Sequence, residues 1–360
     1  MPRLFAVVVT MIAALALAPA APAKVSRDFV GITSEDVFAG DARYRSQNLA
    51  AQSALGIGLI RQTFDWSRIE TAPGQYDLSY HDEYVAAAAA HGITILPILF
   101  RAPDFHAGRR HPNGWACAPK SNASLAAFAA ALVRRYGPKG SLWAERPGLR
   151  KLPIRSWQIW NEPNLAQYWC GRPKAKQYVA MLRTVGKAIK RADRKAHIVT
   201  AGLPPSLLGN AVRLPRYLDQ MYKAKAAKYF DSLAINSYAK DHRQLARLLG
   251  SIRKLMNKRG DARGRIWITE LGWGDKGPKS RFVVGEAGQA KQIAKSLAFI
   301  KAKRKKLGLR GIVYFSWRDG APYAPKFEDQ WGLHTGLLDV NGTPKKAFES
   351  FGRRLKALVP

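Results

Sequence analysis

The sequence predicts an α/β protein with one domain, a (β/α)8 TIM barrel whose site lies at the C-terminal face of the strands. Eight short, continuously apolar runs alternate with longer stretches rich in Ala, Leu and Lys at helical period. Continuous apolar runs are typical of parallel strands that are buried on both faces. A chain of 360 residues, 47% of them hydrophobic, is long enough for one such barrel. An open doubly wound sheet is the alternative, although no GxGxxG fingerprint accompanies the first strand.

The predicted strands are separated by helical segments and loops, as βα units require. They occupy residues 29–32, 57–63, 93–100, 155–161, 197–202, 232–236, 265–269 and 311–316. Amphipathic helices are predicted at residues 82–90, 124–136, 174–192 and 286–307. In barrels of this kind the loops after the strands carry the active site, so residues at the strand ends are the functional candidates.

The first 23 residues are predicted to be a secretory signal peptide, which leaves residues 24–360 as the catalytic domain. Arg3 gives a positive start, residues 4–17 are apolar, and Ala21-Pro22-Ala23 fits a cleavage site. An uncleaved anchor is the alternative, but the apolar run is short of the ~20 residues that span a bilayer. We expect a secreted or extracytoplasmic monomer with no stable membrane insertion after cleavage.

The two cysteines, Cys117 and Cys170, are predicted to form a disulfide. An even pair in an exported protein favours a bond over two free thiols. The cysteines follow the predicted third and fourth strands, which are neighbours in a barrel. A disulfide between them would tie two loops together at the mouth and shape a wall of the cleft.

The formal net charge of +34 favours contact with polyanions, such as wall polymers or an anionic polysaccharide. A solvated basic surface is the alternative, because the basic residues are spread along predicted helix faces. Neither zinc-finger spacing nor an RNA-binding aromatic signature is present, so we expect no nucleic acid partner. The sequence also lacks an HExxH pair, a Cys/His zinc pattern and a Gly-rich phosphate loop, and we expect neither a metal nor a cofactor.

Two glutamates are the principal catalytic candidates. Glu162 follows the fourth predicted strand and Glu270 ends the seventh, so a barrel places both at one mouth. A pair of carboxylates is the equipment for cleavage of a glycosidic bond. Taken alone, Glu162 could instead be a helix-cap partner and Glu270 a surface residue in a turn.

The sequence around these glutamates resembles the retaining glycoside hydrolases of clan A. Trp160-Asn161-Glu162-Pro163 is similar to the acid/base motif of that clan, and residues 268–272 are similar to its nucleophile motif. Residues 60–77, 316–317 and 336–348 also match, so the resemblance covers the mature chain. It is strongest for family 39, with family 5 next. The resemblance implies that Glu162 is the acid/base and Glu270 the nucleophile.

Further residues at the strand ends are predicted to bind substrate or to position the glutamates. Arg61 could stabilise the Glu270 anion, Tyr238 could orient Glu270, and Asn161 could bind the sugar 2-hydroxyl. Arg61 could also be a plain ion pair, and Tyr238 could cap the core. Trp317 is the predicted floor of the cleavage subsite, and Asn236, Trp66 and Trp273 are further substrate-binding candidates. Four other tryptophans also fall at strand ends or in loops: Trp115, Trp160, Trp169 and Trp331.

These features predict a secreted retaining glycosidase that cleaves a β-linked polysaccharide internally. An exo-acting enzyme similar to a β-xylosidase is the alternative, but family 39 xylosidases usually carry a β-sandwich after the barrel. On the sixth strand the clan often has a histidine before the tyrosine, whereas this chain reads Asn236-Ser237-Tyr238, which leaves the sugar open. A non-catalytic barrel that binds glycans or polyanions is the third hypothesis.

Overall fold

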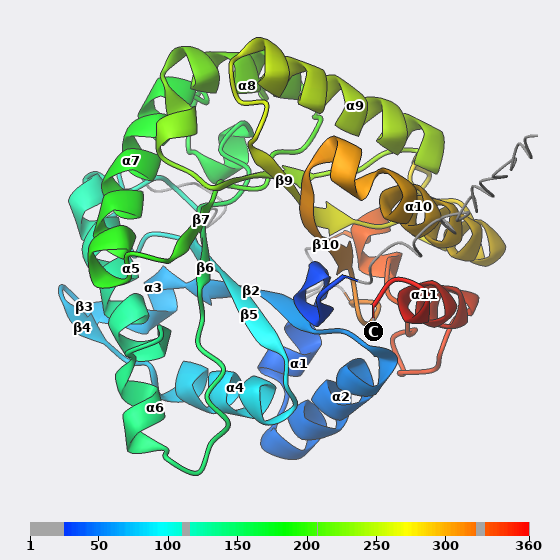
Figure 1. Ribbon diagram of the computed structural model, residues 1–360, viewed down its shortest axis with the longest axis horizontal. Coiled ribbons are helices and arrows are strands. Elements are labelled where there is room, and N and C mark those ends of the chain that lie inside the picture. Colours follow the sequence, from blue (N-terminus) through cyan, green and yellow to red (C-terminus); the bar gives the residue numbers. More distant parts are fainter. Residues whose placement is uncertain (1–24, 110–115, 207, 322–327, 360) are drawn as a thin grey trace, which may run out of the picture.

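The computed structural model describes residues 25–109, 116–206, 208–321 and 328–359. Eight parallel strands close into a barrel in the order β1-β10-β9-β8-β7-β6-β5-β2, and helices surround it (Figure 1). The predicted (β/α)8 barrel is therefore confirmed. Its strands are β1 (Val30–Thr33), β2 (Leu59–Asp65), β5 (Thr94–Phe100), β6 (Ser156–Ile159), β7 (His197–Val199), β8 (Ser232–Asn236), β9 (Arg265–Leu271) and β10 (Leu309–Phe315).

Strand β1 closes the barrel because it pairs with both β10 and β2. The predicted strands agree with the observed ones except at their ends. β7 is the shortest of the barrel strands and ends before the predicted boundary. The hydroxyl of Thr200 there accepts a hydrogen bond from the backbone of Ala234 at 2.8 Å, in place of a ladder carbonyl.

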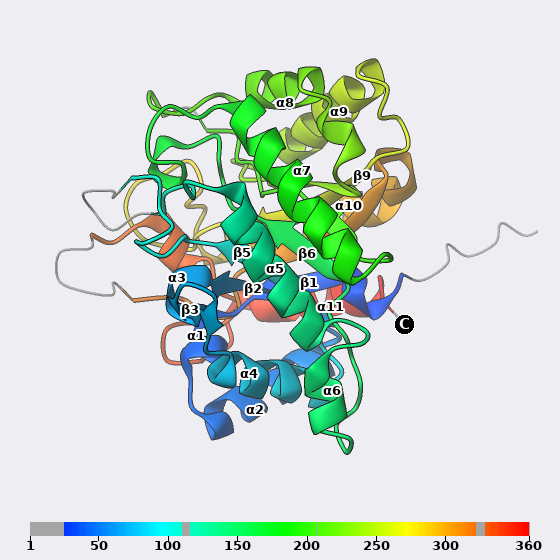
Figure 2. The same cartoon turned by 90° about the vertical axis from the view of Figure 1, so that its left-hand side faces the viewer.

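The outer helices lie around the barrel, as the side view shows (Figure 2), and they pack against it through an apolar layer. All four predicted helices are present, and α4 and α5 begin a few residues earlier than predicted. Ser121 caps α5 through its hydroxyl, which accepts a hydrogen bond from Ala123. The main helices are α2 (Ala42–Leu55), α4 (Ser79–Ala90), α5 (Asn122–Tyr136), α7 (Ala175–Ala192), α8 (Leu214–Lys223), α9 (His242–Lys258), α10 (Glu286–Leu307) and α11 (Lys346–Lys356).

The barrel interior has its own small apolar cluster. Leu59, Leu96, Val199, Ala234, Trp267 and Val313 point inward from six strands. Trp157 instead belongs to the layer between barrel and helices. Both tryptophans are fully buried and lie in the core.

A short hairpin lies outside the βα units, and the sequence did not predict it. It consists of β3 (Glu70–Ala72) and β4 (Gln75–Tyr76), and it follows β2 and the short helix α3 (Trp66–Ile69).

Two of the sequence predictions concern residues that the structure does not describe: the signal peptide, residues 1–23, and Trp115. Within the described part of the chain, no helix combines the length and hydropathy needed to cross a membrane.

Candidate active site

A cavity of about 830 Å³ opens at the C-terminal ends of the strands. Its lining comes from the ends of strands and from the loops that follow them, as expected for a barrel active site. Five of the predicted site residues line it: Arg61, Asn161, Glu162, Tyr238 and Glu270. The structure thus brings both catalytic candidates to one cavity.

Asn236 joins the two glutamates directly. Its Nδ2 donates to Glu162 Oε1 at 2.7 Å and to Glu270 Oε1 at 3.0 Å. Since both oxygens lie this close to one nitrogen, they are at most about 6 Å apart, which fits the roughly 5–5.5 Å between carboxyl groups of retaining glycosidases better than the wider spacing of inverting ones. Asn236 is fully buried and its Oδ1 accepts from Thr269, so this side chain positions the carboxylates. It was predicted to bind substrate, and it is not among the residues that line the cavity.

Arg61, from β2, holds the other side of Glu270. Its guanidinium donates to Glu270 Oε1 at 2.8 Å, to Asn161 Oδ1 at 2.9 Å and to Gln158 Oε1 at 2.8 Å. Tyr238 donates its hydroxyl to Glu270 Oε2. With Asn236, three side chains therefore donate hydrogen bonds to this one buried carboxylate.

Glu162 has the opposite environment. Burial raises its pKa to about 8, and the nearby negative charge of Glu270 adds to this effect. The hydrogen bond from Asn236 and the positive charge of Arg61 oppose the rise. Glu162 is therefore protonated near neutral pH beside a carboxylate held by cationic and polar donors. When two neighbouring carboxyl groups have such different environments, one can act as the acid and the other as the base or nucleophile.

The backbone around Glu162 is strained. Trp160 and Glu162 have φ values of 71° and 47°, in the left-handed region that non-glycine residues rarely adopt. Such strain persists where neighbouring contacts enforce it, and it concentrates at functional sites. Two hydrogen bonds hold this segment: Glu162 N to Gly202 O at 3.1 Å, and Trp160 Nε1 to Tyr168 O at 2.8 Å.

Gly202 provides the space that Asn236 needs. A Cβ at this position would lie 2.1 Å from Asn236 Oδ1 and 2.9 Å from Thr269 Oγ1. Only glycine lets the end of β8 approach so closely. The glutamate pair thus depends on a glycine in the loop after β7, two strands before Glu270 of β9.

One wall of the cavity is aromatic and includes Trp331, Phe282, Phe315 and Tyr238. Trp331 lies edge-on to Tyr238, with ring centroids 5.0 Å apart, and packs against Phe282. Trp331 is only partly buried, so its ring is available to an apolar face of a sugar.

Three tryptophans predicted to contact substrate, Trp317, Trp273 and Trp66, do not line the cavity in this structure. Each is fully buried, and each indole N–H is used inside the protein. Trp317 donates to Asn48 of α2 at 2.9 Å, Trp273 to the carbonyl of Ala239 at 2.8 Å, and Trp66 to Glu70. They pack the structure behind the site. Phe315, the last residue of β10, reaches the cavity where Trp317 was expected.

Sequence reasoning missed several residues of the site. Glu35, just after β1, lines the cavity and accepts a hydrogen bond from Gln62 at 2.8 Å. Desolvation by the surrounding protein raises the pKa of Glu35. Arg281 lines the same cavity and stacks over Phe282. Gln158 lies in the interior of β6 behind Arg61. Its polar side chain within an apolar strand was the one available signal.

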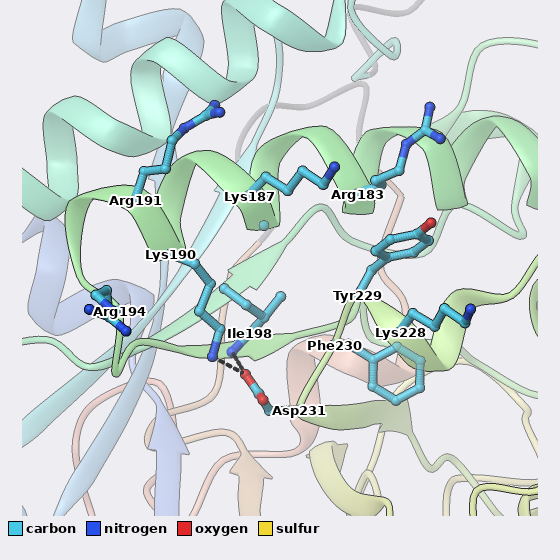
Figure 3. A pocket seen from close by; sticks show the side chains of 11 residues that line it. Arg183, Lys187, Lys190, Arg191, Arg194, Ile198, Lys228, Tyr229, Phe230 and Asp231 are labelled. Atoms are coloured by element: carbon cyan, nitrogen blue, oxygen red, sulfur yellow. Dashed lines mark hydrogen bonds and ion pairs between the residues drawn. The ribbon is translucent and has the colours of Figure 1, made fainter.

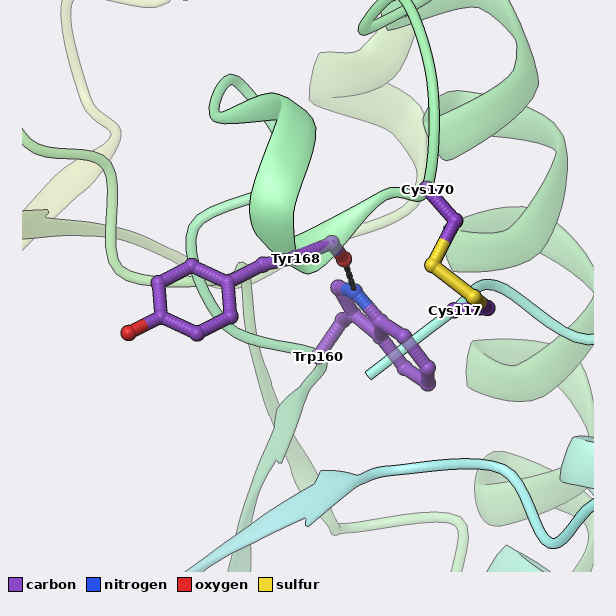
Figure 4. Close-up of a disulfide and its surroundings, with 4 residues drawn as sticks. All are labelled: Cys117, Trp160, Tyr168 and Cys170. Carbon is purple, nitrogen blue, oxygen red and sulfur yellow. Dashed lines mark hydrogen bonds between the residues drawn. A yellow bond between two sulfur atoms is a disulfide. The ribbon is translucent and has the colours of Figure 1, made fainter. Parts of the chain in front are cut away.

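The predicted disulfide is present. Cys117 and Cys170 are joined, with a Cα–Cα distance of 4.8 Å. Figure 4 shows the bond beside Trp160 and Tyr168. Tyr168 and Cys170 both belong to the segment that follows Glu162. Tyr168 itself lines the cavity, so the disulfide braces one wall. Within the described ranges, no group of three or more His, Cys, Asp or Glu side chains could hold a metal ion.

Comparison with known proteins supports the fold. No protein-family model matches the chain, and no curated protein matches it by sequence. Solved structures do match it: a family 39 glycoside hydrolase from Bacteroides cellulosilyticus (TM-score 0.65, 16% identity), a monomeric β-xylosidase from Caulobacter crescentus (0.64, 18%) and a family 39 enzyme from Xanthomonas axonopodis pv. citri (0.69, 16%). They cover 92%, 91% and 94% of this chain.

The chain spans 64% of the length of the first of these structures and 68% of the other two. At such identities the likeness is one of fold. The predicted resemblance to family 39 glycoside hydrolases is confirmed at that level, and the chain shares the barrel on which those enzymes are built.

Proposed function

We propose that the protein is a retaining glycoside hydrolase that cleaves O-glycosidic bonds by double displacement. The proposal rests on the position of the Asn236 side chain, whose Nδ2 lies 2.7 Å from Glu162 Oε1 and 3.0 Å from Glu270 Oε1. It brings one protonated and one donor-stabilised carboxyl group to the spacing that this mechanism uses.

Glu270 is the nucleophile in this proposal. Its carboxylate attacks the anomeric carbon, and the bond from that carbon to the leaving oxygen breaks. Glu162, whose pKa is about 8, gives its proton to the leaving oxygen. Formation of the glycosyl ester removes the negative charge of Glu270, which lowers the pKa of Glu162. Glu162 then takes a proton from water, which attacks the ester and frees Glu270.

Asn161 is the proposed contact for the sugar 2-hydroxyl. Its Oδ1 is held by Arg61 at 2.9 Å, which leaves the amide nitrogen for a ligand in the cavity that it lines. A hydrogen bond to this hydroxyl strengthens in the transition state.

The proposed substrate is a β-linked polysaccharide, cleaved internally. A volume of about 830 Å³ lies toward the upper end of the roughly 300–1,000 Å³ typical of ligand pockets, which suits several sugar units. Exo action is the second candidate, since similar structures include a β-xylosidase and an exo-β-1,4-mannosidase. Product lengths from a defined oligosaccharide separate the two, because exo action releases only terminal units.

Export is proposed on the basis of residues 1–23, with cleavage after Ala23. The Cys117–Cys170 disulfide supports this, because disulfides persist in oxidising compartments. N-terminal sequencing of the protein recovered from the medium tests the cleavage, and light scattering tests the proposed monomer.

The mechanism is tested with Glu270→Gln and Glu162→Gln on a panel of polysaccharides and aryl glycosides. Glu270→Gln should nearly abolish turnover of every substrate. Glu162→Gln should slow substrates with poor leaving groups far more than those with good ones, which need no proton. Equal losses on both substrate types would refute the role of Glu162. An inverted product anomer by NMR would refute that of Glu270, and glycan binding without any hydrolysis would favour a non-catalytic barrel.

A further inference from the structure

A basic furrow follows the outer face of α7, on the outside of the barrel. Two cavities of about 780 and 620 Å³ lie along this helix, and Arg183 and Tyr229 line both. The 18 residues of α7 rise ~27 Å at ~1.5 Å each. We call this feature the α7 furrow; its cations include Lys176, Arg183, Lys187, Arg191, Arg194 and Lys228.

The cations form one stripe along the helix. Arg183, Lys187 and Arg191 are spaced by four residues, which places them on one face, and all three are exposed. None of the three makes an ion pair within the described chain. Asp231 is the one carboxylate among the described residues that line the furrow, and it is paired with Lys190 at 2.9 Å (Figure 3).

This stripe destabilises the helix that carries it. Like charges four residues apart on a helix repel one another, and among the described residues no acidic side chain forms an ion pair with Arg183, Lys187 or Arg191. A bound polyanion would supply the missing negative charge. A hollowed surface also concentrates the field of such charges more than a convex helix face does.

The furrow also has an apolar floor. Tyr229 and Phe230 are half-buried beside Ile198, and Figure 3 shows the Tyr229 ring next to Lys228. Aromatic rings among cations suit a polymer whose units carry both a flat apolar face and an acid group. Acidic sugars have both, whereas a simple anion would use the cations alone.

One end of the furrow adjoins the catalytic cavity. Lys174 lines the furrow and also a third cavity of about 600 Å³ beside the disulfide, which Cys170 lines too. Gln167 and Tyr168, a few residues earlier, line the catalytic cavity. A single short segment therefore separates the furrow from the proposed site of cleavage.

We propose that the α7 furrow is a binding site, distinct from the catalytic cavity, for a linear acidic polysaccharide. The furrow holds a carboxylate-bearing chain beside the mouth of the barrel. Binding in the furrow stands independently of catalysis; delivery of the chain to the cavity rests on the proposed glycosidase function.

The test compares two variants of equal net charge. The furrow variant carries Arg183→Glu, Lys187→Glu and Arg191→Glu. The control carries Arg247→Glu, Lys254→Glu and Lys258→Glu, at exposed positions of α9. Binding to polygalacturonate is measured at several salt concentrations. The furrow variant should bind at least about tenfold more weakly than wild type, the control within about twofold, and added salt should reduce the difference.

Three results would overturn the proposal. Equal losses in both variants would mean that the overall charge binds the polymer. Unchanged affinity of the furrow variant would mean that the furrow does not. A single-stranded oligonucleotide that binds through the furrow more tightly than polygalacturonate would assign it a different occupant. Aryl glycoside turnover, measured on wild type and on the furrow variant, reports separately on catalysis. If wild type bound polygalacturonate through the furrow but hydrolysed no glycoside, the proposed function would be disproved and the proposed binding site would still stand.

Discussion

The guanidinium of Arg61 lies 2.8 Å from the carboxylate of Glu270, and both side chains are buried. The same guanidinium also holds Gln158 and Asn161. A planar fork of five donors can satisfy three separate acceptors, which an ammonium group cannot do with the same geometry. Arg61 therefore sets both the charge and the position of the site.

Replacement of Arg61 separates these two roles. Arg61→Lys keeps the charge but loses part of the hydrogen-bonding fork, so we expect kcat/KM for an aryl glycoside to fall on the order of 10²-fold. Arg61→Met leaves Glu270 without its buried partner and should destabilise the protein by about 3–5 kcal/mol in urea unfolding. A fully active Arg61→Met variant would show that Glu270 does not need this cation.

The pH dependence of activity should follow Glu162. In the free enzyme its pKa is about 8, and the mechanism needs the protonated form. We therefore expect kcat/KM to fall as pH rises through about 8. The loss should be smaller for a substrate with a good leaving group. A profile that stays flat to well above this pH for poor leaving groups would contradict the assignment.

Stability should depend on the same proton. Glu162 titrates at about 8 in the folded protein against an ordinary value of 4.5, so the folded state binds the proton more tightly than the unfolded one. Its contribution to stability is complete below pH 4.5 and is lost as pH rises toward 8. The free energy of unfolding of wild type, relative to Glu162→Gln, should fall by a few kcal/mol across this range. If the difference in free energy of unfolding between wild type and Glu162→Gln did not change with pH, burial would not raise the pKa of Glu162.

The sequence predicted the parts of the site that strand direction determines. Glu162 follows β6, Glu270 lies near the end of β9, and Arg61 lies within β2. The C-terminal ends of the strands of a barrel share one face, so the sequence could place these three side chains together. Side chains beyond the strand ends were harder to place. After Phe315 the chain turns, Trp317 bonds back to Thr33, and its indole leaves the cavity for α2.

Contacts between distant loops explain what could not be predicted. Trp331 reaches the cavity because it packs on Phe282, which belongs to the loop after a different strand. Asn236 was placed correctly at the end of β8, but a sequence does not tell whether an amide points at a ligand or bridges two neighbours. That distinction depends on the space left by Gly202.

Gly202 offers a test of the Asn236 bridge. In Gly202→Ala the new Cβ would lie 2.1 Å from Asn236 Oδ1, so the amide must move and the glutamate pair loses its link. We expect kcat/KM to fall at least about tenfold in a folded protein. The control is Gly209→Ala, in a nearby loop, where a Cβ would meet nothing within 4 Å. Equal activity of the two variants would show that the bridge is dispensable.

The two tryptophans near β10 should have opposite phenotypes. Trp331 is partly exposed in the cavity, so Trp331→Ala removes a surface on which a sugar can stack and should raise KM by about tenfold, with little change in melting temperature. Trp317 is 1% exposed and bonds to Asn48. Trp317→Ala should therefore cost about 3–5 kcal/mol of stability while KM of the folded fraction stays unchanged. Steady-state kinetics and urea unfolding on both variants distinguish the two roles. A raised KM in Trp317→Ala, with stability intact, would return Trp317 to the cleavage subsite and remove Trp331 from it.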